Sequence, residues 1–227
     1  MYIRFKIFPY ISENHIKNIA LKTIGGLMSK GNFDFWREVW EKYPHSQIVY
    51  ATEMGKVRQT YFIELLGKRK GLTLDLGCGD GHLRPFILEF VGLDVSRDAL
   101  SKIDGDVALG VGEVLPFRDE VFNRVVISET FEHLTDRSKC LRETRRVLKP
   151  SGELIIATPY GFDPNRLTSS KRLKKYGVHE RLYPDGRFNE PLMRGLLNDF
   201  GFLTAFSKVL YVKKVPSNLI VIAIKRA

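Results

Sequence analysis

The sequence predicts an α/β fold in which a doubly wound, mostly parallel sheet is covered by helices. Three observations support this fold class. Short apolar runs alternate with helical patterns from residue 72 onward, as in successive strand–helix–strand units. The first run leads into a turn with glycine at every second position. The last two runs are separated only by residues 213–216, so we expect them to pair as an antiparallel hairpin.

The apolar runs have the length and composition expected of strands. They cover residues 72–76, 90–94, 107–111, 124–128, 153–158, 203–212 and 217–225. Helical periodicity between the runs predicts the connecting helices, which we expect at residues 82–88, 97–103 and 138–148. The last of these presents one apolar face, formed by Leu141, Thr144, Val147 and Leu148.

Helices are also expected before and within the second half of the sheet. Residues 52–66 form the first, and its inward side chains are predicted to be Val57, Tyr61, Phe62 and Leu65. The second starts from Asn189 as N-cap, and the side chains predicted to share its apolar face are Leu192, Leu196 and Phe200. We expect residues 1–45 to be an N-terminal extension with cap helices, and residues 46–227 to be the main domain.

Composition narrows the class of protein. The formal net charge is +10, which suits an anionic partner such as nucleic acid, anionic lipid or an acidic metabolite, although a solvated basic surface is equally compatible. The longest apolar run, residues 219–224, is too short to span a bilayer. Two cysteines, Cys78 and Cys140, cannot form a disulfide framework and are expected to be free thiols. The cytoplasm is therefore the expected location.

The turn after the first strand carries the strongest local signal. Asp75 precedes glycines at positions 77, 79 and 81, which would let a ligand approach backbone N–H groups. A dinucleotide-binding fingerprint would need glycine where His82 stands, so that alternative fits poorly. The next strand ends in Asp94, where a carboxylate can accept both hydroxyls of a ribose. Asp94 could also cap the helix that begins at Arg97, and the two roles are compatible.

Four ordered motifs extend this pattern. They are the glycine turn, the segment 112–117 (GEVLPF), the segment 132–134 (EHL) and the segment 147–156 (VLKPSGELII). Together they resemble the class I S-adenosylmethionine-dependent methyltransferases, in the group that includes ubiquinone and menaquinone C-methyltransferases, over about residues 50–225. The resemblance implies a Rossmann-like seven-stranded sheet of order 3-2-1-4-5-7-6. It also implies S-adenosylmethionine as cofactor, S-adenosylhomocysteine as its product, and methyl transfer to a C, O or N nucleophile.

The resemblance also implies a set of cofactor-binding residues: Asp75, Gly77, Cys78, Gly79, Gly81, Asp94, Val95, Gly112, Glu113, Val114, Ser128 and Glu129. One position departs from the family pattern, because Val111 stands where family members often have an aspartate that binds the adenine amino group. We therefore expect adenine to be held by backbone groups of Gly112 and Glu113 and by apolar contacts with Val95 and Val114.

His133 is the candidate catalytic residue, because an imidazole titrates near neutrality and could act as base or hydrogen-bond partner. It could equally be structural, capping a helix or bridging strands. Glu132 is expected to be a structural partner rather than a base. The sequence contains no His, Cys and Asp cluster at metal-ligand spacing, so no metal is expected.

The segment after the fifth strand is rich in cations and tyrosines, and the candidate acceptor-binding residues in it are Tyr160, Arg166, His179 and Tyr183. We expect residues 160–187 and the N-terminal 45 residues to cover the acceptor. A small or anionic acceptor is the first interpretation. RNA, contacted by the basic segment 166–187 through phosphates and stacked bases, is the alternative. A non-catalytic S-adenosylmethionine-binding partner protein is a third, and the oligomeric state is left open.

Overall fold

The computed structural model describes residues 53–66, 69–160 and 188–227. These residues form a seven-stranded sheet of order β3-β2-β1-β4-β5-β7-β6, which confirms the expected topology. The strands are β1 (Thr73–Leu76), β2 (Phe90–Asp94), β3 (Asp106–Leu109), β4 (Phe122–Ser128), β5 (Leu148–Pro159), β6 (Phe202–Val212) and β7 (Val215–Lys225). The first five strands run parallel, whereas β7 is antiparallel to both of its neighbours, as the hairpin predicts.

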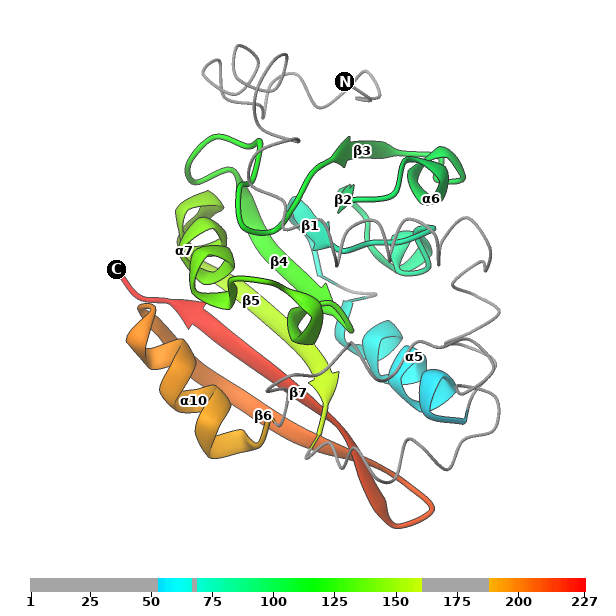
Figure 1. Ribbon diagram of the computed structural model, residues 1–227, viewed down its shortest axis with the longest axis vertical. Helices are drawn as coiled ribbons and strands as arrows, with labels where there is room; N and C mark the ends of the chain where they lie inside the picture. The colour runs from blue at the N-terminus through cyan, green and yellow to red at the C-terminus, as the bar shows by residue number, and fades with distance from the viewer. Residues whose placement is uncertain (1–52, 67–68, 161–187) are drawn as a thin grey trace.

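Helices cover both faces of this sheet (Figure 1). On one face lie α7 (Arg137–Val147) and α10 (Glu190–Asp199), and on the other lie α5 (Glu53–Leu66) and α6 (Arg97–Ser101). Successive side chains of a strand alternate between the two faces, and β4 shows this directly. Val125 and Ile127 belong to the core under α7, while Val126 belongs to the core under α5.

The helix expected over residues 82–88 is wrong. The structure has a turn there, followed by the short 3-10 helix η2 (Arg84–Phe86). An α-helix would need residue 85 to donate its N–H to the carbonyl of Gly81, and Pro85 has no N–H to donate. The Gly81 carbonyl accepts from Arg84 N instead, at 2.9 Å, so the chain turns in i→i+3 steps.

The buried faces of α5 and α10 also differ from the prediction. On α5, Val57 is exposed, and the inward positions are taken by Arg58, Phe62 and Leu66 at intervals of one turn. On α10, Met193 and Leu197 are buried and Leu192 is 52% exposed, while Leu196 and Phe200 pack at the margin of the core. The sequence pattern located both helices, and on α5 Phe62 is buried as predicted while Tyr61 and Leu65 pack against the core; Val57 and Leu192 are the predicted inward residues that are exposed.

Some expectations lie outside the described residues, among them the cap helices over residues 1–45. None of the described helices has the length and apolar character required to cross a membrane. Cys78 and Cys140 are both buried free thiols, as expected. Burial raises the pKa of each thiol, since a thiolate is poorly solvated in an apolar core.

Candidate functional site at the carboxyl edge of the sheet

The parallel strands bring two acids to one edge of the sheet. Asp75 lies near the end of β1, and its neighbour across the strand pair is Gly92 of β2. Asp94 ends β2, two residues further along. Because parallel strands end at the same edge, both side chains lie at the carboxyl edge, where ligands bind in open α/β sheets. Both are buried, with exposed fractions of 1% and 5%.

The glycine turn after β1 has backbone conformations that favour glycine. Gly77, Gly79 and Gly81 all have positive φ angles, of 77°, 55° and 80°. A Cβ on Gly77 would lie 2.8 Å from the Cβ of Thr130, so a side chain would collide with the segment that follows β4. The glycines therefore let the turn pass close beneath that segment.

The turn's N–H groups are largely used within the protein, which corrects the expectation that they would be free for a ligand. Gly77 N and Cys78 N both donate to the carbonyl of Leu93, at 2.7 and 3.1 Å, and Gly81 N donates to Cys78 O. The Cys78 thiol points inward and would contact a Cβ on Gly92 at 2.8 Å. The turn would therefore contribute to ligand binding through its shape rather than through N–H groups left free for a ligand.

Asp94 organises the turn directly. Its Oδ2 accepts a hydrogen bond from Gly79 N and its Oδ1 accepts one from Ser96 N, each at 2.9 Å. Burial raises the pKa of this carboxyl, while the backbone hydrogen bonds oppose the shift. Each oxygen still has a lone pair available, so the carboxylate can also accept ribose hydroxyls. The predicted helix cap is wrong for Asp94, because Ser96 Oγ accepts from Ala99 N and caps α6.

Asp75 has an unused acceptor. Its Oδ2 is buried and has no hydrogen-bond partner among the described residues. Burial, and secondarily the Asp94 carboxylate, raise the pKa of Asp75 to about 8. A buried carboxyl oxygen without a partner is unfavourable unless a ligand satisfies it. An ammonium group, such as that at the methionine end of S-adenosylmethionine, has the charge and donors that this oxygen needs.

The segment 111–119 is fixed from the side of α7. Glu113 Oε1 accepts from Thr135 N at 3.0 Å and from Asp136 N at 3.3 Å, so its carboxylate joins this segment to the start of α7. Arg146 donates to the carbonyls of Leu115 and Phe117. Gly112 and Val114 therefore hold a defined position beside the end of β3, where backbone groups of Gly112 and the side chain of Val114 could contact an adenine. Val95 follows Asp94 at the same edge.

After β4 the chain enters a buried polar cluster. Ser128 ends the strand, and Glu129 follows with a φ of 52°. Glu129 Oε2 forms an ion pair with Arg58 Nη1 at 2.9 Å, and its Oε1 accepts from Asn218 Nδ2 at 2.7 Å. Burial raises the pKa of Glu129, although Arg58 opposes the shift. The sequence interpretation missed Arg58 and Asn218. Arg58 could have been found, because it stands one helical turn before Phe62 on the apolar face of α5.

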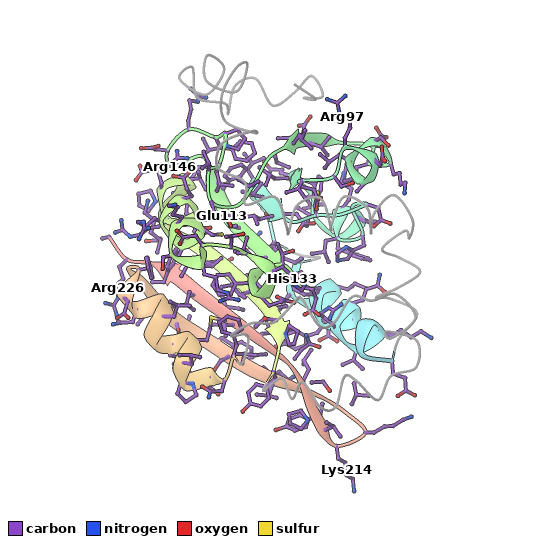
Figure 2. All side chains as sticks on the ribbon, viewed as in Figure 1. Arg97, Glu113, His133, Arg146, Lys214 and Arg226 are labelled. Carbon is purple, nitrogen blue, oxygen red and sulfur yellow. The ribbon has the colours of Figure 1, made fainter. Side chains whose placement is uncertain are left out.

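His133 ends the 3-10 turn η3 (Phe131–His133), which Figure 2 shows beyond the end of β4. Its Nε2 lies 3.7 Å from Glu132 Oε1, and its side chain is 14% exposed. Glu132 Oε2 accepts from Thr158 Oγ1 at 3.2 Å, and burial raises the pKa of Glu132 well above its usual range. The helix-capping alternative for His133 is wrong, because the Asp136 side chain accepts from Lys139 N and caps α7.

Of the candidate acceptor residues, Tyr160 is placed by the structure. Its N donates to Ser217 O at 3.0 Å, and it forms an isolated bridge with Phe188. Arg166, His179 and Tyr183 lie outside the described residues. Within the described ranges, no group of three or more His, Cys, Asp or Glu side chains is arranged to hold a metal ion.

Sequence comparisons agree with this geometry. Residues 74–156 match the family model described as a methyltransferase domain. A ubiquinone/menaquinone biosynthesis C-methyltransferase of Vibrio vulnificus is 32% identical over 166 residues, which cover 63% of this chain and 62% of that protein. The chain spans about half the length of the curated relatives it matches.

Solved structures share the fold. The complex of a Haloferax volcanii methyltransferase with the Trm112 methyltransferase activator gives a TM-score of 0.62 at 19% identity, over 86% of this chain and 98% of that one. The structure of Burkholderia thailandensis 1,6-didemethyltoxoflavin-N1-methyltransferase with bound S-adenosylhomocysteine gives a TM-score of 0.64 at 18% identity. The match covers 86% of this chain and 88% of that one.

The strand order, the glycine turn and the acid that ends β2 define a Rossmann-like methyltransferase fold of class I. Residues 74–156 match the methyltransferase domain family, and the solved structures that share this fold include S-adenosylmethionine-dependent methyltransferases.

Proposed function

We propose that this chain transfers a methyl group from S-adenosylmethionine to a C, O or N nucleophile of a small organic acceptor by in-line displacement. The observation that carries the proposal is the Oδ2 of Asp75, which is buried at the carboxyl edge near Asp94 and has no hydrogen-bond partner among the residues that the structure describes. This pair offers one acceptor for an ammonium and another for ribose hydroxyls. This chain covers only part of the length of the relatives it matches, so the proposed activity rests on the site.

The residues present fit the donor. Asp94 would hold the ribose, Asp75 and the carbonyl of Ser128 the ammonium, and the segment 112–114 the adenine. Glycine at 77 and 81 lets the turn pack closely against Thr130 and Ile103, which gives the turn its shape. When bound, S-adenosylmethionine supplies a methyl group that its sulfonium has already activated.

The chain's own contribution to rate is positioning and the exclusion of water, which can supply a large part of the barrier reduction. Three polar groups after β4 would adjoin the place where an acceptor meets the donor: the buried Glu132 and the partly exposed Glu129 and His133. His133 has the partial exposure that a group touching the acceptor requires, and we assign it the role of accepting a proton from acceptors that must lose one.

The RNA alternative rests on the basic segment 166–187, which lies outside the described residues. Net charge alone does not favour it over a small acceptor.

Two measurements test the proposal. Calorimetry with S-adenosylhomocysteine should show binding in the micromolar range, and labelled S-adenosylmethionine should label a small-molecule fraction of a metabolite extract. Failure to bind S-adenosylhomocysteine would refute the site. Binding without labelling would support the alternative of a non-catalytic partner protein. Labelling of RNA alone would support the alternative of an RNA methyltransferase.

A further inference from the structure

Glu132 is a buried carboxyl group with one unused oxygen. It lies in η3, directly after β4. Its Oε2 accepts a hydrogen bond from Thr158 Oγ1 of β5 at 3.2 Å, whereas its Oε1 has no hydrogen-bond partner in the described part of the chain. A buried carboxyl oxygen without a partner is unfavourable, so its placement calls for an explanation.

The unused oxygen lies beside the imidazole of His133. Oε1 is 3.7 Å from His133 Nε2, a distance that suits an ion pair but is too long for a hydrogen bond. The Glu132 side chain is 1% exposed and the His133 side chain 14%, so the carboxyl group lies deeper than the imidazole. A ligand entering from solvent would therefore contact His133, and Glu132 would act on that ligand only through the imidazole.

The backbone of η3 is held on both sides of Glu132. Arg137 of α7 donates from Nε to the carbonyl of Phe131 at 3.2 Å and from Nη2 to the carbonyl of Glu132 at 2.8 Å. His133 N donates to the carbonyl of Thr130 at 3.0 Å. With the backbone fixed in this way and Oε2 held by β5, the carboxyl group and the imidazole keep their relative positions.

The charges around Glu132 link its proton to that of His133. Burial, and then the Glu129 carboxylate, raise the pKa of Glu132. The Thr158 hydroxyl and the Arg58 guanidinium are among the groups that oppose this rise. An imidazolium carries an N–H on both ring nitrogens, so a protonated His133 presents Nε2–H to Oε1 whichever nitrogen gained the proton. The pair therefore holds its last proton more firmly than an imidazole beside a neutral group would.

We propose that Glu132 is a positioning residue for His133, an inference that rests on the proposed function. Its Oε1 fixes the imidazole and stabilises the imidazolium that forms when the methyl acceptor loses a proton to the ring. In that step the proton of the nucleophile passes to His133 and the nucleophile bonds to the methyl carbon. The carbon–sulfur bond of the donor breaks, and its electron pair stays on sulfur.

The test uses two variants that change the carboxyl group in opposite ways. Glu132→Gln keeps the shape and an acceptor for the Thr158 hydroxyl, but it carries no negative charge. Thr158→Val keeps the charge and removes the hydrogen bond that stabilises it. The control is Glu153→Gln, which removes a carboxylate paired with two arginines at the opposite end of β5. Transfer from labelled S-adenosylmethionine to the extract fraction that wild type labels is measured between about pH 5 and 9, and S-adenosylhomocysteine affinity is measured by calorimetry.

Glu132→Gln should reduce turnover at least about tenfold and leave S-adenosylhomocysteine affinity within about twofold of wild type. The pH of half-maximal turnover should fall in Glu132→Gln, because the imidazole loses the charge that holds its proton. It should rise in Thr158→Val, because a carboxylate without its hydrogen bond binds a proton more tightly. It should stay unchanged in Glu153→Gln. Adding Glu132→Gln to His133→Ala should cause no further loss, because no imidazole is left to position.

The inference is overturned if wild type is active and both variants keep its pH profile, or if the losses from Glu132→Gln and His133→Ala multiply in the double variant. Either result would leave Glu132 as a structural partner of Thr158 alone. Wild type that labels nothing would refute the proposed function, and this inference with it.

Discussion

Thr130 lies against the backbone of Gly77, and its Oγ1 is 3.4 Å from the carbonyl oxygen of Gly77 and 3.2 Å from that of Ser128. This contact joins the turn after β1 to the segment that leaves β4, the two parts of the chain between which the donor's methionine end is expected to lie.

Gly77→Ala should therefore disrupt both parts together. The new methyl group would collide with Thr130, and the φ of 77° is strained for any residue with a Cβ. We expect a loss of about 1–3 kcal/mol in stability and at least tenfold weaker binding of S-adenosylhomocysteine. Gly195→Ala is the matched control, because a Cβ there meets nothing within 4 Å and α10 should become slightly more stable. Equal effects of the two substitutions on melting temperature would contradict the packing argument.

Asp94→Ala should weaken S-adenosylhomocysteine binding by about 1–3 kcal/mol, the usual loss for a charge-assisted acceptor. The control is Asp98→Ala, which removes an exposed carboxylate from the first turn of α6. Calorimetry should show near-normal affinity in the control. Unchanged affinity in Asp94→Ala would remove the ribose assignment, whatever its effect on the glycine turn.

The raised pKa of Asp75 predicts that the free energy of unfolding depends on pH. Its pKa is raised from 3.8 to about 8 in the folded protein, so the folded state holds a proton that the unfolded state has lost between these values. This contribution to stability is present in full below pH 4 and disappears as pH rises through 8. Asp75→Asn should therefore flatten the fall in unfolding free energy between pH 5 and 8, measured by urea unfolding.

Ligand binding should act on the same proton. An ammonium beside Asp75 favours the carboxylate, so S-adenosylhomocysteine should release a proton on binding near pH 7 and bind more tightly at pH 8 than at pH 6. Calorimetry in two buffers of different ionisation enthalpy counts that proton. The same proton count in Asp75→Asn as in wild type would assign the release to another group.

His133→Ala should leave S-adenosylhomocysteine binding nearly intact and reduce turnover by about 10²–10⁴, the range for general acid–base catalysis. Asp136 rather than His133 caps α7, so little change in helix stability is expected. Single-turnover rate and melting temperature are measured on the same variant. A destabilised protein with full activity would show that His133 is structural.

Arg146→Lys should loosen the adenine side of the site. Arg146 donates to the carbonyls of Leu115 and Phe117 and to the carboxylates of Asp119 and Glu143, and lysine cannot replace all of these bonds. Binding of S-adenosylhomocysteine and of 5′-methylthioadenosine should weaken by the same factor, about three- to tenfold. Arg145→Lys is the control on the same turn. A loss confined to S-adenosylhomocysteine would point to the methionine end instead.

The apolar runs and the final hairpin were sufficient to locate the strands and the antiparallel pair, whereas the strand order was implied by the resemblance to class I methyltransferases, and the structure confirms it. The sequence was also sufficient to bring Asp75 and Asp94 to one edge, since both lie at or next to the carboxyl ends of parallel strands. It failed where one residue's chemistry overrides a periodic pattern. Pro85 removes the hydrogen bond that a helix needs, and Arg58 takes an inward position because Glu129, distant in sequence, supplies a partner.

Gly92 has no room for a side chain, because two neighbours already fill the space beside it. A methyl group on Gly92 would meet the Cys78 sulfur at 2.8 Å and the Phe90 ring at 2.9 Å. The thiol comes from the turn after the first strand and the ring from the second strand itself, so the two contacts are independent. Gly92→Ala should therefore destabilise the protein even when Cys78→Gly removes the sulfur, because the contact with Phe90 remains.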